Sequence, residues 1–195
     1  MNRDHISSIT SSIMLFYAKC LVYPYDEMNY ELQHLFRIIE REEVGDDQIE
    51  YIEQVLSVIN VYQGEEIRDL REEYVSLFTF NETGQPLCPM MASDFNRFKM
   101  IKYDPWEAEE LILDSGIPIN MDEPVDSVIN YLEYFSLLCE EALSGSLDTD
   151  KIHIFFEHHI INWIPIFCDT LYKRASLNFF KEVAFGLKNY LIAFD

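Results

Sequence analysis

The sequence is poor in residues that interrupt regular structure, and it has no long apolar run. Only six glycines and seven prolines occur among its 195 residues, while apolar residues make up 49% and aromatic residues 14%. This composition excludes a disordered chain and is typical of a packed globular protein. No stretch approaches the roughly 18 uninterrupted apolar residues of a transmembrane helix, and the N-terminus lacks the apolar core of a signal peptide. We therefore expect a soluble, cytoplasmic protein with no direct membrane insertion.

Basic residues are scarce as well. The chain has 14 lysines and arginines against 35 aspartates and glutamates, which gives a formal net charge of −21. A field of this sign repels nucleic acid and anionic membranes, so neither is expected as a partner. The same field speeds the encounter with cationic partners, such as peptides that carry arginine or lysine.

Cysteine and histidine are few and lack the spacing of a metal site. Cys20, Cys88, Cys139 and Cys168 lie far apart, with no Cys-x-x-Cys pair and no Cys/His pattern typical of zinc. They are expected to be buried free thiols in a reducing compartment. His159 shares the apolar face of its segment, where a core histidine is more common than a ligand. No cofactor or metal is predicted from these residues.

Helical periodicity runs through most of the chain. Apolar residues recur every three or four positions in segments separated by proline, glycine or charged breaks, and no segment alternates with a period of two. The expected helices span 6–22, a segment after Asp26, a segment from Asp46, 65–80, 94–102, 106–114, 123–142, a segment from Asp148 or Thr149 that Pro165 kinks or restarts, and a segment capped by Ser176. The sequence therefore predicts an all-α, single-domain bundle over residues 1–195, with about nine or ten helices.

The segment 117–142 joins an acidic turn to an amphipathic helix. Asp122 or Glu123 is placed to cap the helix, Pro124 suits its first turn, and Asp126 favours the positive end of the helix dipole. Four residues form a polar line opposite the apolar stripe: Glu123, Asp126, Asn130 and Glu133. Such a line at a helix start suits a cationic partner, and a solvated helix face is the plainer alternative.

The loop 81–93 is apolar in its second half, where Leu87, Met90 and Met91 stand. Methionine adapts to irregular partners, so this loop is expected either to lie under the core or to offer a soft binding surface.

Two patterns keep a metal-dependent enzyme open as an alternative. Asp46, Asp47 and Glu50 resemble the Asp-rich magnesium motif of helical prenyl-diphosphate enzymes, although the pair also stands where a helix cap is expected. Glu31 and His34 have the Glu-x-x-His spacing of di-iron bundles, which need two such copies. A phosphate-binding Gly-rich loop, a Gly-x-Ser-x-Gly elbow and a Cys/His nucleophile pair are absent. A binding protein is therefore the main prediction.

Three stretches together resemble the TorD/DmsD/NarJ family of redox-enzyme maturation chaperones. The first joins the aromatic segment 74–78 to the loop 88–95. The second, Glu-Pro-Val-Asp-Ser at 123–127, is similar to the family's Glu-Pro-x-Asp-His hinge, with serine in place of histidine. The third joins the His-x-x-x-Trp of 159–163 to the Phe-Phe pair at 179–180. The match in order and spacing runs from about residue 70 to the end of the chain.

The resemblance implies an all-helical chaperone, not an enzyme, that binds a leader peptide or the apo catalytic subunit of a molybdenum-containing oxidoreductase. Such a chaperone, as used in anaerobic respiration, retains its client until the cofactor is in place; twin-arginine signal peptides are the typical leaders. Nine residues are expected in the peptide-binding site: Tyr74, Phe78, Pro89, Met90, Ser93, Glu123, Pro124, Asp126 and Ser127. An acidic scaffold without leader preference is a third interpretation. The client, and the choice between a monomer and a domain-swapped dimer, stay open at this stage.

Overall fold

The computed structural model describes residues 8–42, 48–79, 84–97, 106–114, 123–145 and 149–194. In this part of the chain, the elements are α1 (Ser8–Cys20), α2 (Met28–Arg41), α3 (Ile49–Gly64), α4 (Ile67–Phe78), α5 (Ala92–Arg97), α6 (Trp106–Asp114), α7 (Val128–Leu143), α8 (Thr149–Phe155), a π-helical turn (Phe156–Ile160), α9 (Ile164–Arg174) and α10 (Asn178–Phe194). No strand forms within these ranges, apart from one isolated β-bridge between Met91 and Ser127. The all-α prediction is confirmed.

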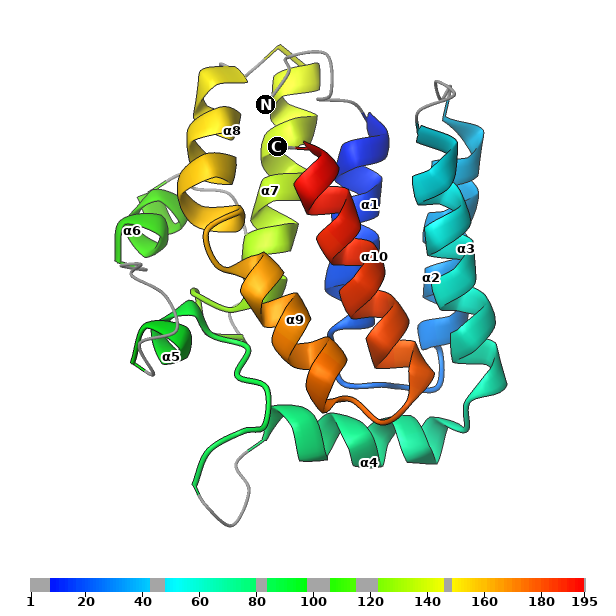
Figure 1. Cartoon of the computed structure of the whole chain (residues 1–195). Helices are drawn as coiled ribbons and strands as arrows, with labels where there is room; N and C mark the ends of the chain where they lie inside the picture. Colours follow the sequence, from blue (N-terminus) through cyan, green and yellow to red (C-terminus); the bar gives the residue numbers. More distant parts are fainter. Residues whose placement is uncertain are drawn as a thin grey trace.

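The long helices stand side by side, and α4 crosses one end of them (Figure 1). In the bundle, α1 packs against α7 and α2, while α10 packs against α9 and α3. The start of α1 and the end of α10 lie at the end opposite α4, and the short helices α5 and α6 lie at the side of the bundle (Figure 1). Helix α4 therefore covers one end of the bundle (Figure 1).

The buried apolar side chains form one connected core, to which α1, α7 and α10 contribute most. Aromatic rings meet edge to face there: the centroids of Tyr131 and Trp163 are 5.6 Å apart, with their planes at 81°. Such contacts stabilise the core beyond the area that they bury. All four cysteines are free and buried, as the sequence predicts.

Close helix packing requires glycine at position 186 of α10. A Cβ atom there would clash with the hydroxyl of Tyr17 in α1 and would lie 2.7 Å from Cγ of Gln54 in α3. The absence of a side chain at Gly186 therefore lets three helices approach one another.

The carboxylate of Glu73 connects α4 to the turn between α9 and α10. It accepts hydrogen bonds from the backbone N–H groups of Ser176 and Leu177, the latter at 2.9 Å from Oε2. The sequence predicts Ser176 as the cap of the last helix, but the helix begins at Asn178, and this carboxylate from α4 satisfies the N–H groups just before it. Glu73 thereby holds α4 across the end of the bundle.

The predicted start of α7 is wrong. The helix begins at Val128 with Ser127 as its N-cap, whose Oγ accepts from the N–H of Asn130 at 3.1 Å. Pro124 and Asp126 lie in the preceding turn because residues 126–128 make backbone hydrogen bonds to the loop 90–92, which competes with helical geometry. The interpretation of the polar line as a solvated helix face is also wrong. Asp126 and Asn130 are buried, with 5% and 0% of their surface exposed.

Other helix boundaries agree with the sequence. The predicted 106–114 helix is α6, and Pro165 stands in the first turn of α9, after the π-helical turn, so it restarts the helix. Helix α5 is described from Ala92 to Arg97, and residues 98–102 of the predicted 94–102 helix lie outside the described residues, as do Asp46 and Asp47.

Candidate functional site

The loop that follows α4 and the turn that precedes α7 lie side by side. The N–H of Val128 donates to the carbonyl of Met90 at 2.8 Å, and the N–H of Ala92 donates to the carbonyl of Asp126 at 3.0 Å. These bonds flank the bridge between Met91 and Ser127. We refer to residues 84–91 as the loop and to residues 123–127 as the hinge. Two segments more than thirty positions apart in sequence thus form one paired unit.

The side chains of Asp126 and Asn130 stabilise this pairing, the first by a bond to Ser93 and the second by bonds to the hinge backbone. Oδ2 of Asp126 accepts from the N–H of Ser93 at 2.9 Å. Nδ2 of Asn130 donates to the carbonyls of Glu123 and Pro124 at 3.2 and 2.9 Å. Buried polar groups are stabilising when they are bonded in this way. Asp126 and Asn130 therefore set the shape of the hinge.

The loop is also attached to α4. The N–H of Cys88 donates to the carbonyl of Leu77 at 2.8 Å, and both Cys88 and Pro89 are buried. Met90 and Met91 are half-buried, while 38% of Leu87 is exposed. The first alternative is thus confirmed for Cys88 and Pro89, which pack into the core. Leu87 faces solvent, and a binding role for the loop stays a prediction.

Four side chains form an aromatic surface beside this unit: Tyr23, Tyr74, Phe78 and Met90. The centroid of the Tyr74 ring lies 4.8 Å from that of Phe78 and 5.4 Å from that of Tyr23, and its hydroxyl donates to Sδ of Met90 at 3.8 Å. Phe78 is anchored in turn by Phe180 of α10, at 5.8 Å. Tyr23, from the connection between α1 and α2, is absent from the predicted site because no motif marks it.

The carboxylate of Glu123 acts electrostatically on this surface. Burial, together with the charge of the nearby Glu123 carboxylate, raises the pKa of Tyr74 to about 12. Tyr74 therefore stays protonated at neutral pH and keeps its hydroxyl as a hydrogen-bond donor. Burial also raises the pKa of Asp94, with a further contribution from Asp126 across the loop and hinge.

The nine predicted site residues lie on α4, the loop, the hinge and α5, in two environments. Tyr74, Phe78, Met90 and Glu123 are half-buried and Ser93 and Pro124 are exposed, whereas Pro89, Asp126 and Ser127 are buried. The side chains of Asp126 and Ser127 bond to backbone groups of the protein itself. Asn130, which sequence reasoning placed only on the polar line, is the additional residue that holds the hinge.

The third motif stretch belongs to the core. Trp163, Phe179 and Phe180 are fully buried, and His159 packs on Phe155 with ring centroids 5.2 Å apart. Burial lowers the pKa of His159 to about 4, so this ring is neutral at physiological pH. The prediction of a core histidine is confirmed.

Metal-ligand groupings are not found in the described ranges, where no three His, Cys, Asp or Glu side chains are placed to share an ion. Glu31 accepts a hydrogen bond from the hydroxyl of Tyr25 at 2.6 Å, and His34 is exposed. Asp46 and Asp47 of the Asp-rich alternative lie outside the described residues.

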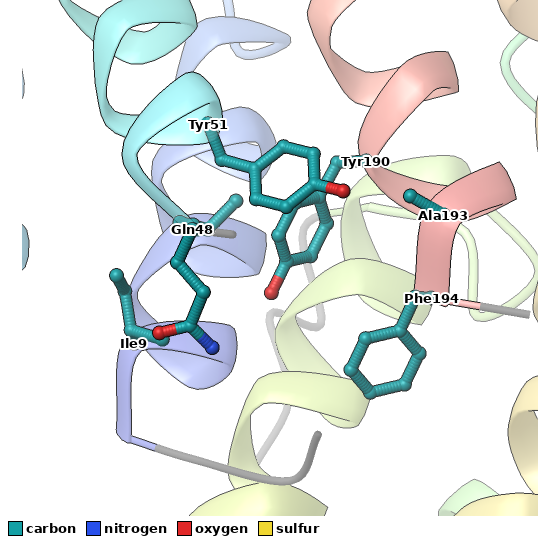
Figure 2. A pocket seen from close by; sticks show the side chains of 7 residues that line it. Ile9, Gln48, Tyr51, Tyr190, Ala193 and Phe194 are labelled. Carbon is teal, nitrogen blue, oxygen red and sulfur yellow. The ribbon is translucent and has the colours of Figure 1, made fainter. Parts of the chain in front are cut away.

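A pocket of about 220 Å³ lies at the end of the bundle opposite α4, between α1, α3 and α10 (Figure 2). Its lining is mainly apolar and aromatic: Ile9, Ile13, Gln48, Tyr51, Tyr190, Ala193 and Phe194. The hydroxyl of Tyr190 donates to Oγ1 of Thr10 at 3.1 Å, and the ring meets Tyr51 edge to face. None of the nine predicted site residues lines this pocket.

Comparison with known proteins shows the family to which the chain belongs. The profile of the nitrate reductase delta subunit family matches residues 41–169, more than half of the chain and all of this unit. The chain belongs to this family. The resemblance to the NarJ and TorD type of chaperone is thereby confirmed, and the family is one of maturation chaperones and not of catalytic enzymes.

The fold is similar to that of a solved structure from Archaeoglobus fulgidus, described as a candidate redox enzyme maturation protein. The alignment covers 93% of each chain with a TM-score of 0.63 and 18% identity. Among proteins of curated function, none matches this sequence. Within the described residues, no helix is both long and apolar enough to cross a bilayer.

Proposed function

We propose that this redox-enzyme maturation chaperone binds a leader peptide, or an equivalent segment of its apo-subunit, at the aromatic surface and the hinge. The pairing of the loop with the hinge is the observation that carries this proposal. Through the bond from Val128 to Met90 it ties the hinge, which carries Glu123, to the loop residue Met90, which accepts from the hydroxyl of Tyr74; the charge of Glu123 also acts on Tyr74.

This arrangement suits a peptide that is cationic and then apolar, as a twin-arginine signal is. A carboxylate makes strong, charge-assisted hydrogen bonds to a guanidinium group, and the overall charge of −21 attracts such a peptide from a distance. Aromatic rings and the flexible Met90 accommodate varied apolar side chains behind the arginines. Retention of a molybdenum-containing oxidoreductase in the cytoplasm until cofactor insertion is the cellular role that we infer.

The predicted site residues have two different roles in this proposal. Glu123, Tyr74, Phe78 and Met90 contact the peptide, together with the exposed Ser93 and Pro124. The buried Pro89, Asp126 and Ser127 keep the loop and hinge in place.

Calorimetric titration tests the proposal with leader peptides from the oxidoreductases of the source organism. Each peptide is compared with a version in which glutamine replaces its arginines. We expect binding to weaken about tenfold without the arginines and also in Glu123→Gln, since one charge-assisted bond contributes roughly 1.5–3 kcal/mol when it is well formed. The matched control is Glu141→Gln, which removes an exposed carboxylate near the far end of α7.

Other outcomes would redirect the assignment. If no leader binds but the catalytic subunit co-purifies with the chaperone, the client segment lies in the mature subunit. If Glu123→Gln leaves binding unchanged, the acidic-scaffold interpretation gains support. Binding of neither leader nor subunit contradicts the proposed function.

A further inference from the structure

Tyr23 is an exposed aromatic residue held at the edge of the candidate site. Its ring meets Tyr74 edge to face, with centroids 5.4 Å apart and planes at 86°. It keeps 49% of its surface exposed, whereas Tyr74 is half-buried. An exposed ring of this size beside a binding surface is the kind of residue that dominates recognition energies.

The segment that carries Tyr23 is fixed to α4 by an arginine. Nε of Arg71 donates to the carbonyl of Pro24 at 2.8 Å, and its Nη2 donates to the carboxylate of Asp26, also at 2.8 Å. Pro24 is itself buried. Because the backbone next to Tyr23 is already ordered, little conformational entropy remains to be lost there when a ligand covers the ring.

The electrostatic surroundings of the ring favour a cation. Asp26 pairs with Arg71, so the positive charge closest to this segment is compensated. The carboxylate of Glu123 also acts electrostatically on Tyr74, the ring on which Tyr23 packs. The face of an aromatic ring attracts guanidinium and ammonium groups, and an adjacent carboxylate strengthens that preference.

We propose that Tyr23 is a specificity-determining residue of this site, and that its ring stacks on an arginine or lysine side chain of the bound peptide while Glu123 pairs with the positive charge. This inference rests on the proposed peptide-binding function and adds to it the residue class that the chaperone selects. Tyr23 lies before residue 41, where the family match begins. Its role therefore rests on its contacts in this structure.

The test is a double-mutant cycle by calorimetry. The probe is a synthetic peptide with two adjacent arginines followed by a run of leucine and alanine, made also with glutamine for both arginines. We expect Tyr23→Ala to weaken binding of the arginine peptide about two- to fivefold, as a cation–π contact at an exposed site would. The glutamine peptide should bind Tyr23→Ala and the unchanged protein equally.

Two further variants separate the ring from its size and hydroxyl. Tyr23→Phe keeps the π face and should bind like the unchanged protein, whereas Tyr23→Leu keeps apolar area alone and should lose the same two- to fivefold. The control is Phe185→Ala on α10, because that ring is similarly exposed, at 48%. Thermal unfolding monitored by circular dichroism shows whether each variant is folded.

The outcomes separate this inference from the proposed function. If the unchanged protein binds the arginine peptide and Glu123→Gln weakens it, but Tyr23→Ala and Tyr23→Leu do not, the role of Tyr23 is overturned and the function stands. Equal loss for the arginine and glutamine peptides overturns the assignment to a cation. If the unchanged protein binds neither this probe nor any leader of the source organism, both proposals fall.

Discussion

The N–H of Val128, the first residue of α7, donates a hydrogen bond to the carbonyl of Met90 at 2.8 Å. This bond takes a helix-terminal donor, which has no partner within its own helix, and uses it to hold a distant loop. The start of α7 and the position of the loop are therefore determined together. Changes to either segment are expected to act on both.

Asp126 stabilises this pairing through its side chain. Asp126→Ala removes the acceptor of the Ser93 N–H and should lower the free energy of unfolding by about 2 kcal/mol, since the bond involves a carboxylate in a buried site. Urea denaturation measures this loss. Asp126→Asn keeps an oxygen acceptor and should lose less; an equal loss in the two variants would show that charge, and not the hydrogen bond, matters.

Asn130 is expected to control the hinge without touching the peptide. Asn130→Ala removes two donors to the carbonyls of Glu123 and Pro124 and should cost about 1–3 kcal/mol of stability. Peptide binding at Glu123 should weaken as well, because the hinge loses its fixed shape. Asn60→Ala, an exposed position in α3, is the control. Normal stability in Asn130→Ala would contradict this role.

Glu73 is expected to anchor α4. In Glu73→Ala the N–H groups of Ser176 and Leu177 lose their acceptor, and stability should fall by about 1–2 kcal/mol, as when a helix cap is removed. The neighbouring Glu72→Ala should change stability by less than about 0.5 kcal/mol, since Glu72 is exposed and its ion pair with Arg68 lies at the surface. Chemical denaturation compares the two, and similar values would argue against the anchor.

The buried His159 should make stability depend on pH. Its pKa in the folded protein, about 4, is below the usual 6.5, so the unfolded chain binds the proton more readily between these values. This contribution to stability is complete above about pH 6.5, declines as the pH falls, and is lost below about pH 4. The decline amounts to about 3 kcal/mol at most.

The measurement compares urea unfolding of the unchanged protein and of His159→Gln at pH 7.5 and pH 5. The variant should lose less stability between these two values than the unchanged protein, because its side chain does not titrate. Identical losses in both proteins would exclude His159 as a source of the pH dependence.

Much of the fold is predictable from local sequence. The spacing of apolar residues and the positions of proline and glycine define most helices, including α6 to the residue and the restart of α9 at Pro165. The burial of Cys20, Cys139, Cys168 and His159 follows from the same stripes. These features depend on neighbours within one or two helical turns, so the sequence pattern contains them directly.

The candidate site is predictable only as a set of residue names taken from motifs. The structure brings α4, the loop and the hinge, which carry two of the motifs, into one region. Some side chains of this region make contacts that the sequence pattern does not predict. By helical periodicity, Asp126 and Asn130 belong to a solvated polar line. In the structure they are buried and make hydrogen bonds to backbone groups.

Three relationships were decided by tertiary structure alone: the start of α7, the anchoring of α4 by Glu73, and the placement of Tyr23 on Tyr74. In each, the partner is distant in sequence. Glu73 and Leu177, for example, are 104 positions apart. A hydrogen-bond donor or a ring specifies what kind of partner it needs but not which one, and only the packing of the helices brings that partner within reach.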